Sequence, residues 1–422
     1  MNGIKVLHRD NDGEYDYLSQ SIFIMLTKQN FETIKEAPFL YDFIKHYRVM
    51  CHEATHYYDN IATLYGQKLL IGAIESLNSI KSTDELDKYK IIDFNNNLKK
   101  VFHDDYYKII YKDIKDNEIS NWDFMSSFGY RYNHKGRIDE NKPIVFTRFS
   151  NKNECVARIP IALESIWECN AIASELITFV VELKKKYDTQ IEIDIEISNL
   201  EKELKDYIYN SSNLVYSNIT HFISKYVTGS GDLLNAYYVT RTISGICSNL
   251  PYFYYNRLKV PKIVSKNING KLISRFKQNH DVGFLFLCLV FNFYEKYDPN
   301  KITPLITLSN DFGEILLSES NLPNKEILEK EIKIEMEKNI KEYDRSIDIL
   351  EIYLKGMLTK GLEIFSNMGL FNSDAEYFLK MEQLKELPFV FLDDESSLQF
   401  KRSDNINKLC KNISEFIRAC NY

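Results

Sequence analysis

The sequence predicts a mainly α-helical protein with a smaller amount of β-structure (an α+β fold). Long segments repeat apolar residues at three- and four-residue steps, which is the periodicity of helices. Short runs near the N-terminus and between residues 124 and 161 have the residue types and alternation of strands. The chain has 422 residues, of which 44% are hydrophobic, and this is enough to bury a sizeable core.

Two candidate strands open the chain, at residues 4–7 and 19–26. Between them lies Asp10-Asn11-Asp12-Gly13, whose residue types favour a turn. A small N-terminal β element is therefore expected before the first long helix.

The first long helix contains His52-Glu53-Ala54-Thr55-His56. Residues four apart lie one turn apart on the same face of a helix, so His52 and His56 can present two imidazoles to one Zn²⁺. Glu53 would then be the base that takes a proton from metal-bound water. The alternative interpretation is an ordinary helix that carries two histidines and an exposed glutamate.

A third ligand must come from elsewhere in the chain. A zincin with a third histidine soon after the motif would need Gly at position 59 and His at position 62, where this chain has Asp59 and Ala62. A glutamate from a second helix is the remaining common solution. Residues 159–175 have helical periodicity, and Glu168 and Glu175 lie on one face of that helix. Glu164, one turn earlier, is the alternative ligand, and a solvated helix face is the ordinary role for all three glutamates.

The segment Trp167-Glu168-Cys169-Asn170-Ala171, followed by Glu175, resembles the glutamate helix of the gluzincin metallopeptidases. In the aminopeptidase-N-like enzymes of that group, Trp is followed by Glu-Gly-x-Ala and then by another Glu. The resemblance implies a zincin-like core with Glu168 as the zinc ligand and Glu175 as a partner for a ligating histidine. Cys169 stands where the family usually has Gly.

Further residues are expected to support this site. Asp59, three residues after His56, lies on the face of the two histidines and could orient an imidazole through its free N–H. Tyr237 and Tyr238 are the first candidates to stabilise the oxyanion.

Arg241 and His221 are the other candidates for that role. His134 is interpreted as a solvated turn residue in preference to a ligand.

The rest of the chain supplies one hairpin and several helices. Residues 130–149 predict a β-hairpin with Gly136 at or near its turn. The apolar residues 282–291 are too few to span a bilayer and predict a buried helix or strand. Helices are also expected at 326–342, 347–365 and 404–417. We expect a catalytic region over residues 1–200, with an inserted segment at about 79–160, and a mainly helical lobe over 201–422.

Composition excludes some classes of function. The net charge is −7 and there is no extended basic patch, so we expect no nucleic-acid binding. The N-terminus lacks the basic and apolar pattern of a secretion signal, and no segment could span a membrane. The seven cysteines are scattered and without metal-binding spacing, which favours reduced thiols and a cytoplasmic location. Cys51 and Cys169, beside the proposed ligands, are interpreted as core residues.

Together, the motif and the resemblance predict a zinc metallopeptidase that hydrolyses a peptide or amide bond in a peptide or protein substrate, with Glu53 activating the zinc-bound water. One alternative is a non-catalytic, zincin-like helical interaction or scaffold protein. Another is a protease effector of bacterial immunity or a toxin system that a regulatory protein partner activates.

Overall fold

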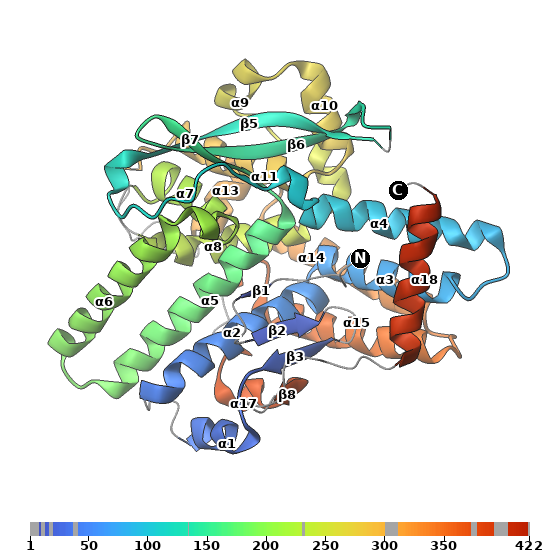
Figure 1. The fold of residues 1–422 in the computed structure, drawn as a ribbon, viewed down its shortest axis with the longest axis horizontal. Coiled ribbons are helices and arrows are strands. Elements are labelled where there is room, and N and C mark those ends of the chain that lie inside the picture. Colours follow the sequence, from blue (N-terminus) through green and yellow to red (C-terminus); the bar gives the residue numbers. More distant parts are fainter. Residues whose placement is uncertain are drawn as a thin grey trace. The chain divides into compact units, whose positions relative to one another are not determined.

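The computed structural model describes residues 8–9, 13–16, 20–36, 41–133, 135–229, 233–299, 311–372, 378–391 and 404–420. Within these residues the chain is mainly helical and has two four-stranded sheets, which confirms the expected fold class. The chain divides into two compact units, whose helices and strands are labelled in Figure 1. Unit 1 comprises Met1–Lys99, Lys333–Gly369 and Asp374–Tyr422, and unit 2 comprises Lys100–Ile332 and Leu370–Ser373.

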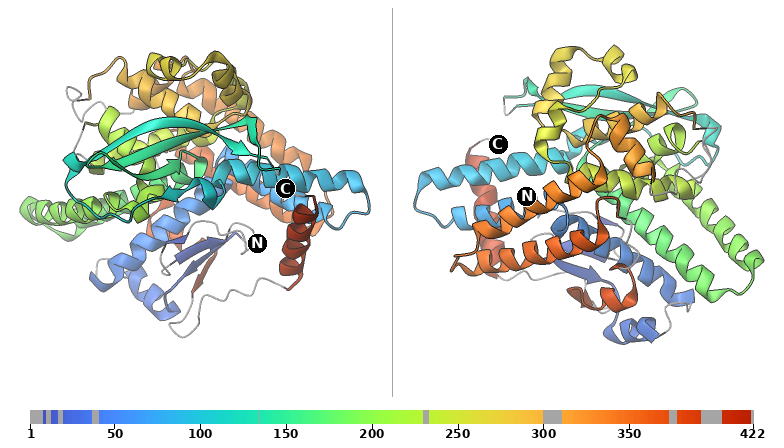
Figure 2. Two further views of the ribbon diagram at one scale, coloured as in Figure 1. Left: turned by 45° about the horizontal axis from the view of Figure 1, so that its top comes forward. Right: turned by 180° about the vertical axis from the view of Figure 1, so that it is seen from behind.

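The sheet of unit 1 joins the two ends of the chain. Its strand order is β1 (His8–Arg9), β2 (Gly13–Asp16), β3 (Ser21–Ile24), β8 (Phe389–Phe391). The first three strands are antiparallel, and β8 pairs with β3 in parallel, as Figure 2 shows. The expected N-terminal β element is present, with β3 inside residues 19–26, whereas residues 4–7 lie outside the described part.

Helix α2 packs against this sheet, and further helices supply the rest of unit 1. They are α1 (Lys28–Glu36), α2 (Tyr41–Ile61), α3 (Leu64–Ser79), η1 (Glu85–Lys88), α15 (Ile349–Met368), α17 (Met381–Leu384) and α18 (Asp404–Ala419). The chain passes between the units within α4 (Tyr89–Phe102) and α14 (Lys325–Glu342), and again before and after Leu370–Ser373. Strand β8 and helix α15 belong to the same unit as the N-terminal helices, and the expected division near residue 200 stays a prediction.

The helix with the histidine motif ends at a sharp break. Thr63 caps α3 by accepting a hydrogen bond from the Gly66 backbone N–H at 3.0 Å. A Cβ at Gly66 would lie 2.1 Å from the carbonyl oxygen of Asn60, so only glycine allows this approach. The helix with the histidine motif therefore ends at Ile61, and α3 is a separate helix.

Unit 2 contains the larger sheet, with strand order β4 (Ile109–Ile110), β7 (Glu154–Pro160), β6 (Ile138–Asn151), β5 (Trp122–Tyr132). All neighbouring strands are antiparallel. The long β5–β6 hairpin confirms the expected one, and Gly136 in its turn has φ +69, a conformation that favours glycine. Short 3₁₀ turns flank the sheet at η2 (Asp105–Tyr107) and η3 (Ile119–Asn121).

The helices of unit 2 cover this sheet and form a common core. They are α5 (Leu163–Lys186), α6 (Gln190–Ile208), η4 (Ser211–Asn213), α7 (Leu214–Tyr226), α8 (Leu233–Asn249), η5 (Tyr252–Asn256), α9 (Lys262–Asn267), α10 (Gly270–Gln278), α11 (Val282–Tyr294) and α13 (Asp311–Glu319). All residues of α11 except the last are buried, so the apolar segment at 282–291 is a core helix, as expected. Among the described residues, no helix is both long and apolar enough to cross a membrane.

Candidate metal centre

The two histidines of the motif lie on one face of α2, as their spacing predicts. Their Nε2 atoms are 3.1 Å apart, and both side chains are 2% exposed. Two nitrogens that bind one tetrahedral zinc at about 2.0 to 2.1 Å are themselves about 3.3 Å apart. The pair therefore already has close to the separation that a shared ion requires.

Contacts along its length hold α2 in place within unit 1. The hydroxyl of Tyr47 donates to the carbonyl of Leu379 at 2.9 Å, and that of Tyr58 donates to the carbonyl of Phe378 at 3.0 Å. At the C-terminal end, the amide of Gln67 donates to the carbonyl of Ile61 at 3.0 Å. Because α2 is hydrogen-bonded to neighbouring segments before and after the motif, the two imidazoles have a rigid support.

The start of α5 is anchored on several sides within unit 2. The backbone N–H of Ile161 donates to the carbonyl of Val145 at 2.8 Å, and the amide of Asn218 donates to the carbonyl of Pro160 at 2.9 Å. A Cβ at Gly283 would lie 2.1 Å from the Ile161 carbonyl oxygen, so α11 packs directly on this backbone. These contacts set the position at which α5 begins.

The residues on either side of Glu168 are anchored as well. The indole of Trp167 donates to the hydroxyl of Ser248 at 3.0 Å, and the thiol of Cys169 lies 3.0 Å from the carbonyl of Tyr216. Burial raises the pKa of Cys169 to about 12, so the thiol stays protonated and can donate this bond. Cys169 and Cys51 are both fully buried, which agrees with their interpretation as core residues.

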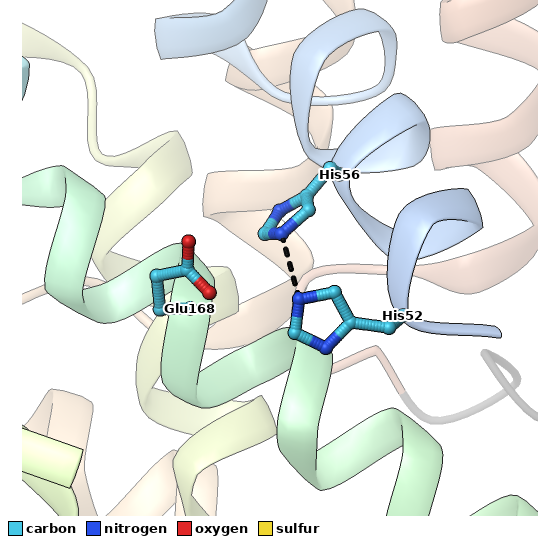
Figure 3. Close-up of side chains that lie close together, drawn as sticks. All are labelled: His52, His56 and Glu168. Carbon is cyan, nitrogen blue, oxygen red and sulfur yellow. Dashed lines mark hydrogen bonds between the residues drawn. The ribbon is translucent and has the colours of Figure 1, made fainter. Parts of the chain in front are cut away.

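His52, His56 and Glu168 form a buried group, shown in Figure 3. One ligand atom from each residue lies within 4.8 Å of the others. Two imidazole nitrogens and one carboxylate oxygen are the donor set of many catalytic zinc sites, and such sites leave a fourth position open. The group could hold a metal ion, and its donors fit zinc.

The alternative ligand, Glu164, has a different partner. Its carboxylate binds the ammonium of Lys108 at 2.7 Å. Burial raises the pKa of Glu164 to about 7, and Lys108 opposes that rise by favouring the charged form. In the described part of the chain, the group with metal-binding distances contains Glu168 and not Glu164.

Glu53 is buried in α2, at 1% exposure, and lies beside the N-terminal sheet. A Cβ built on Gly13 of β2 would lie 3.1 Å from its Cγ and 2.7 Å from Cγ1 of Val49. The sequence had suggested only a turn-forming role for Gly13. In the structure Gly13 begins β2, and the absence of a side chain there leaves room for the proposed base.

The other expected site residues lie on α2, α5 and α8. Asp59 and Glu175 are buried on α2 and α5, at 5% and 3% exposure. Tyr237 is fully buried on α8, and Tyr238 beside it is half-buried. Their roles in orienting imidazoles and stabilising an oxyanion stay predictions.

Two of the alternative oxyanion donors have structural partners. The guanidinium of Arg241 donates to the carbonyl of Asn372 at 3.0 Å. Nε2 of His221 lies 3.3 Å from the carbonyl of Ile208, and the rings of Phe124, Phe149 and Tyr209 surround its imidazole. Burial lowers the pKa of His221 to about 4, as expected for a neutral core histidine. His134 lies outside the described residues.

No family model, curated protein or solved structure matches this chain. The similarity to gluzincins therefore rests on the residues themselves: the histidine pair, Glu168 and the distances between their ligand atoms. These residues could hold a metal ion, and they do not by themselves identify the metal or a reaction.

Proposed function

We propose that this protein is a zinc-dependent metallopeptidase of the gluzincin type, which hydrolyses a peptide or amide bond. The observation that carries the proposal is the buried group of His52, His56 and Glu168, with ligand atoms within 4.8 Å of one another. The position of Glu53, next to the first histidine and buried, supports it. These residues would hold zinc through two Nε2 atoms and one carboxylate oxygen.

Zinc bound there would lower the pKa of a bound water to about 7 and polarise the scissile carbonyl. The carboxylate of Glu53 would accept a proton from the attacking water and deliver it to the nitrogen of the leaving amine. The hydroxyl of Tyr237 or Tyr238 would donate a hydrogen bond to the carbonyl oxygen as its negative charge develops. Asp59 and Glu175 would hold the imidazoles in the tautomer that leaves Nε2 available.

The ligand set is tested by the zinc content of purified variants, measured by mass spectrometry. We expect about one zinc per wild-type chain, and a loss of most of it in His56→Ala and in Glu168→Ala. Glu164→Gln is the matched control, because it removes a carboxylate one turn away and should keep full zinc. If Glu168→Ala keeps zinc while Glu164→Gln loses it, the assignment of the third ligand is wrong.

Catalysis is tested by Glu53→Gln, which removes a carboxylate but no metal ligand. We expect this variant to keep zinc and to cleave a peptide library about 10² to 10⁴ times more slowly than the wild type, the usual contribution of a general base. A wild-type chain that holds zinc and cleaves no member of the library would contradict the peptidase proposal and favour the non-catalytic scaffold.

A further inference from the structure

Two arginines lie directly opposite each other on one face of the larger sheet in unit 2. Arg148 of β6 is paired in register with Arg158 of β7. Directly opposed residues of antiparallel strands share a face, and their Cβ atoms are about 4.5 to 5.5 Å apart. Like charges in this arrangement repel and destabilise the sheet, so the pair calls for an explanation.

Acidic side chains of the same region do not neutralise the pair. Neither guanidinium takes part in an ion pair within the part of the chain that the structure describes. The nearby acids are instead bound by lysines, in the pairs Lys225–Asp123, Lys112–Glu154 and Lys108–Glu164. The chain has a net charge of −7 and thus an excess of carboxylates. None of the carboxylates in the described residues forms an ion pair with Arg148 or Arg158.

One of the two guanidinium groups is held in a fixed position. Arg158 is half-buried, and its Cζ lies 4.7 Å from the centre of the Phe146 ring. Phe146 is itself buried beside the ring of Tyr107, at a centroid distance of 6.5 Å. The cation–π contact holds the Arg158 side chain against the buried Phe146 ring. Because the side chain is already ordered, it would lose less conformational entropy on binding an anion.

The surroundings of the pair have the composition of a protein-binding surface. Met125 of β5 is paired with Arg148 and is 56% exposed. Tyr111 directly follows β4, the strand that pairs with Arg158 through Ile109, and is 52% exposed. Arginine, methionine and tyrosine are enriched in protein interfaces. Nucleic acid is disfavoured, because the whole chain is negatively charged.

We propose that Arg148 and Arg158 form a docking site for an acidic peptide segment of a partner protein. The two planar guanidinium groups would bind a carboxylate through paired N–H···O bonds, and Met125 would contact the apolar part of the segment. The bound carboxylate would replace the repulsion between the arginines with two attractions. This site does not rest on the proposed peptidase activity.

Fluorescence anisotropy with labelled hexaglutamate and hexaglutamine peptides tests the site on the full-length chain. We expect the wild type to bind hexaglutamate more tightly than hexaglutamine. Arg148→Gln and Arg158→Gln should each weaken hexaglutamate binding about tenfold or more, the effect of losing a charge-assisted bond. Arg148→Lys keeps the charge but lacks the planar fork, so it should also bind more weakly than the wild type.

Lys152→Gln is the matched control, because Lys152 is an exposed lysine in the β6–β7 turn and lies outside the arginine pair. This variant should bind hexaglutamate within about twofold of the wild type, since one exposed surface charge outside the pair contributes little. Thermal unfolding of Arg148→Gln checks its folding, and we expect it to be at least as stable as the wild type without peptide. The proposal would be overturned if the wild type bound hexaglutamate and hexaglutamine equally well. It would also be overturned if Lys152→Gln lost as much hexaglutamate affinity as the arginine variants, or if the wild type bound inorganic phosphate and not hexaglutamate.

Discussion

The two helices that supply the metal group are held in different ways. Helix α2 carries both histidines, and its supports lie before and after them, at Tyr47, Tyr58 and Ile61. Helix α5 carries Glu168, and its supports are the immediate neighbours Trp167 and Cys169. Two ligands on one helix keep their spacing as long as the helix is rigid. A single ligand such as Glu168 is positioned by the contacts of the residues next to it. Substitutions at these supporting residues can therefore test the role of each helix independently.

The largest effect is expected at the C-terminal end of α2. A Cβ at Gly361 of α15 would lie 1.8 Å from the carbonyl oxygen of Ile61, which is backbone and cannot rotate away. Gly361→Ala should therefore lower the free energy of unfolding by about 3 kcal/mol or more, as overpacking in a core does. Chemical denaturation measures this change, and zinc content should fall with it.

Gly356, on the same helix, is the matched control for this prediction. A Cβ there would have no atom within 4 Å, so Gly356→Ala should raise stability by about 0.5 to 1 kcal/mol through helix propensity alone. Equal effects of the two substitutions would mean that the close approach of α15 to α2 is not formed in solution.

An effect of almost the same size is expected at His221, on the helix that anchors Cys169. The folded-state pKa is about 4, below the ordinary value of 6.5, so the folded protein favours the neutral ring. Its contribution to stability is therefore complete above pH 6.5 and is lost as the pH falls toward 4. Over that window the wild type should lose about 3 kcal/mol relative to His221→Phe, which cannot titrate.

Denaturation of both proteins at pH 7, 5.5 and 4 measures this difference, and the titrations of all other groups cancel in the comparison. A stability difference that stays constant with pH would show that the imidazole is solvated and not enclosed by the aromatic rings.

A smaller effect is expected at Cys169 itself. Cys169→Ala removes the bond to the carbonyl of Tyr216 and some packing, which should lower the free energy of unfolding by about 1 kcal/mol. Cys169→Gly, which restores the residue usual in gluzincins, should cost about 1 kcal/mol more because glycine weakens a helix. Both variants should keep zinc, and a loss of zinc in Cys169→Ala at full stability would instead make the thiol a ligand.

The smallest effect is expected at Ser248. Ser248→Ala leaves the indole N–H of Trp167 without its acceptor, which should lower stability by about 0.5 to 1.5 kcal/mol. Zinc affinity, measured by competition with a chelator, should fall modestly if Trp167 positions Glu168. Ser248→Thr keeps a hydroxyl and should restore part of the affinity.

The amino-acid sequence by itself determined the features that depend on residues close together in the chain. Spacing of four residues placed His52 and His56 on one face of a helix, and helical periodicity and turn residues located α11 and the β5–β6 hairpin. Glu168 was reached through its resemblance to a family motif, and its distance from the histidines agrees with that choice. These features depend on neighbours a few positions apart, which a sequence displays directly.

Tertiary structure decided the features that depend on distant residues. Pairing of β8 with β3 joins positions more than 360 residues apart, and no local pattern indicates it. The closeness of Gly13 to Glu53, the ion pair of Lys108 with Glu164, and the meeting of Arg148 with Arg158 also depend on how the backbone is packed and registered. Side-chain types limit which contacts are possible, but only packing in three dimensions selects among them.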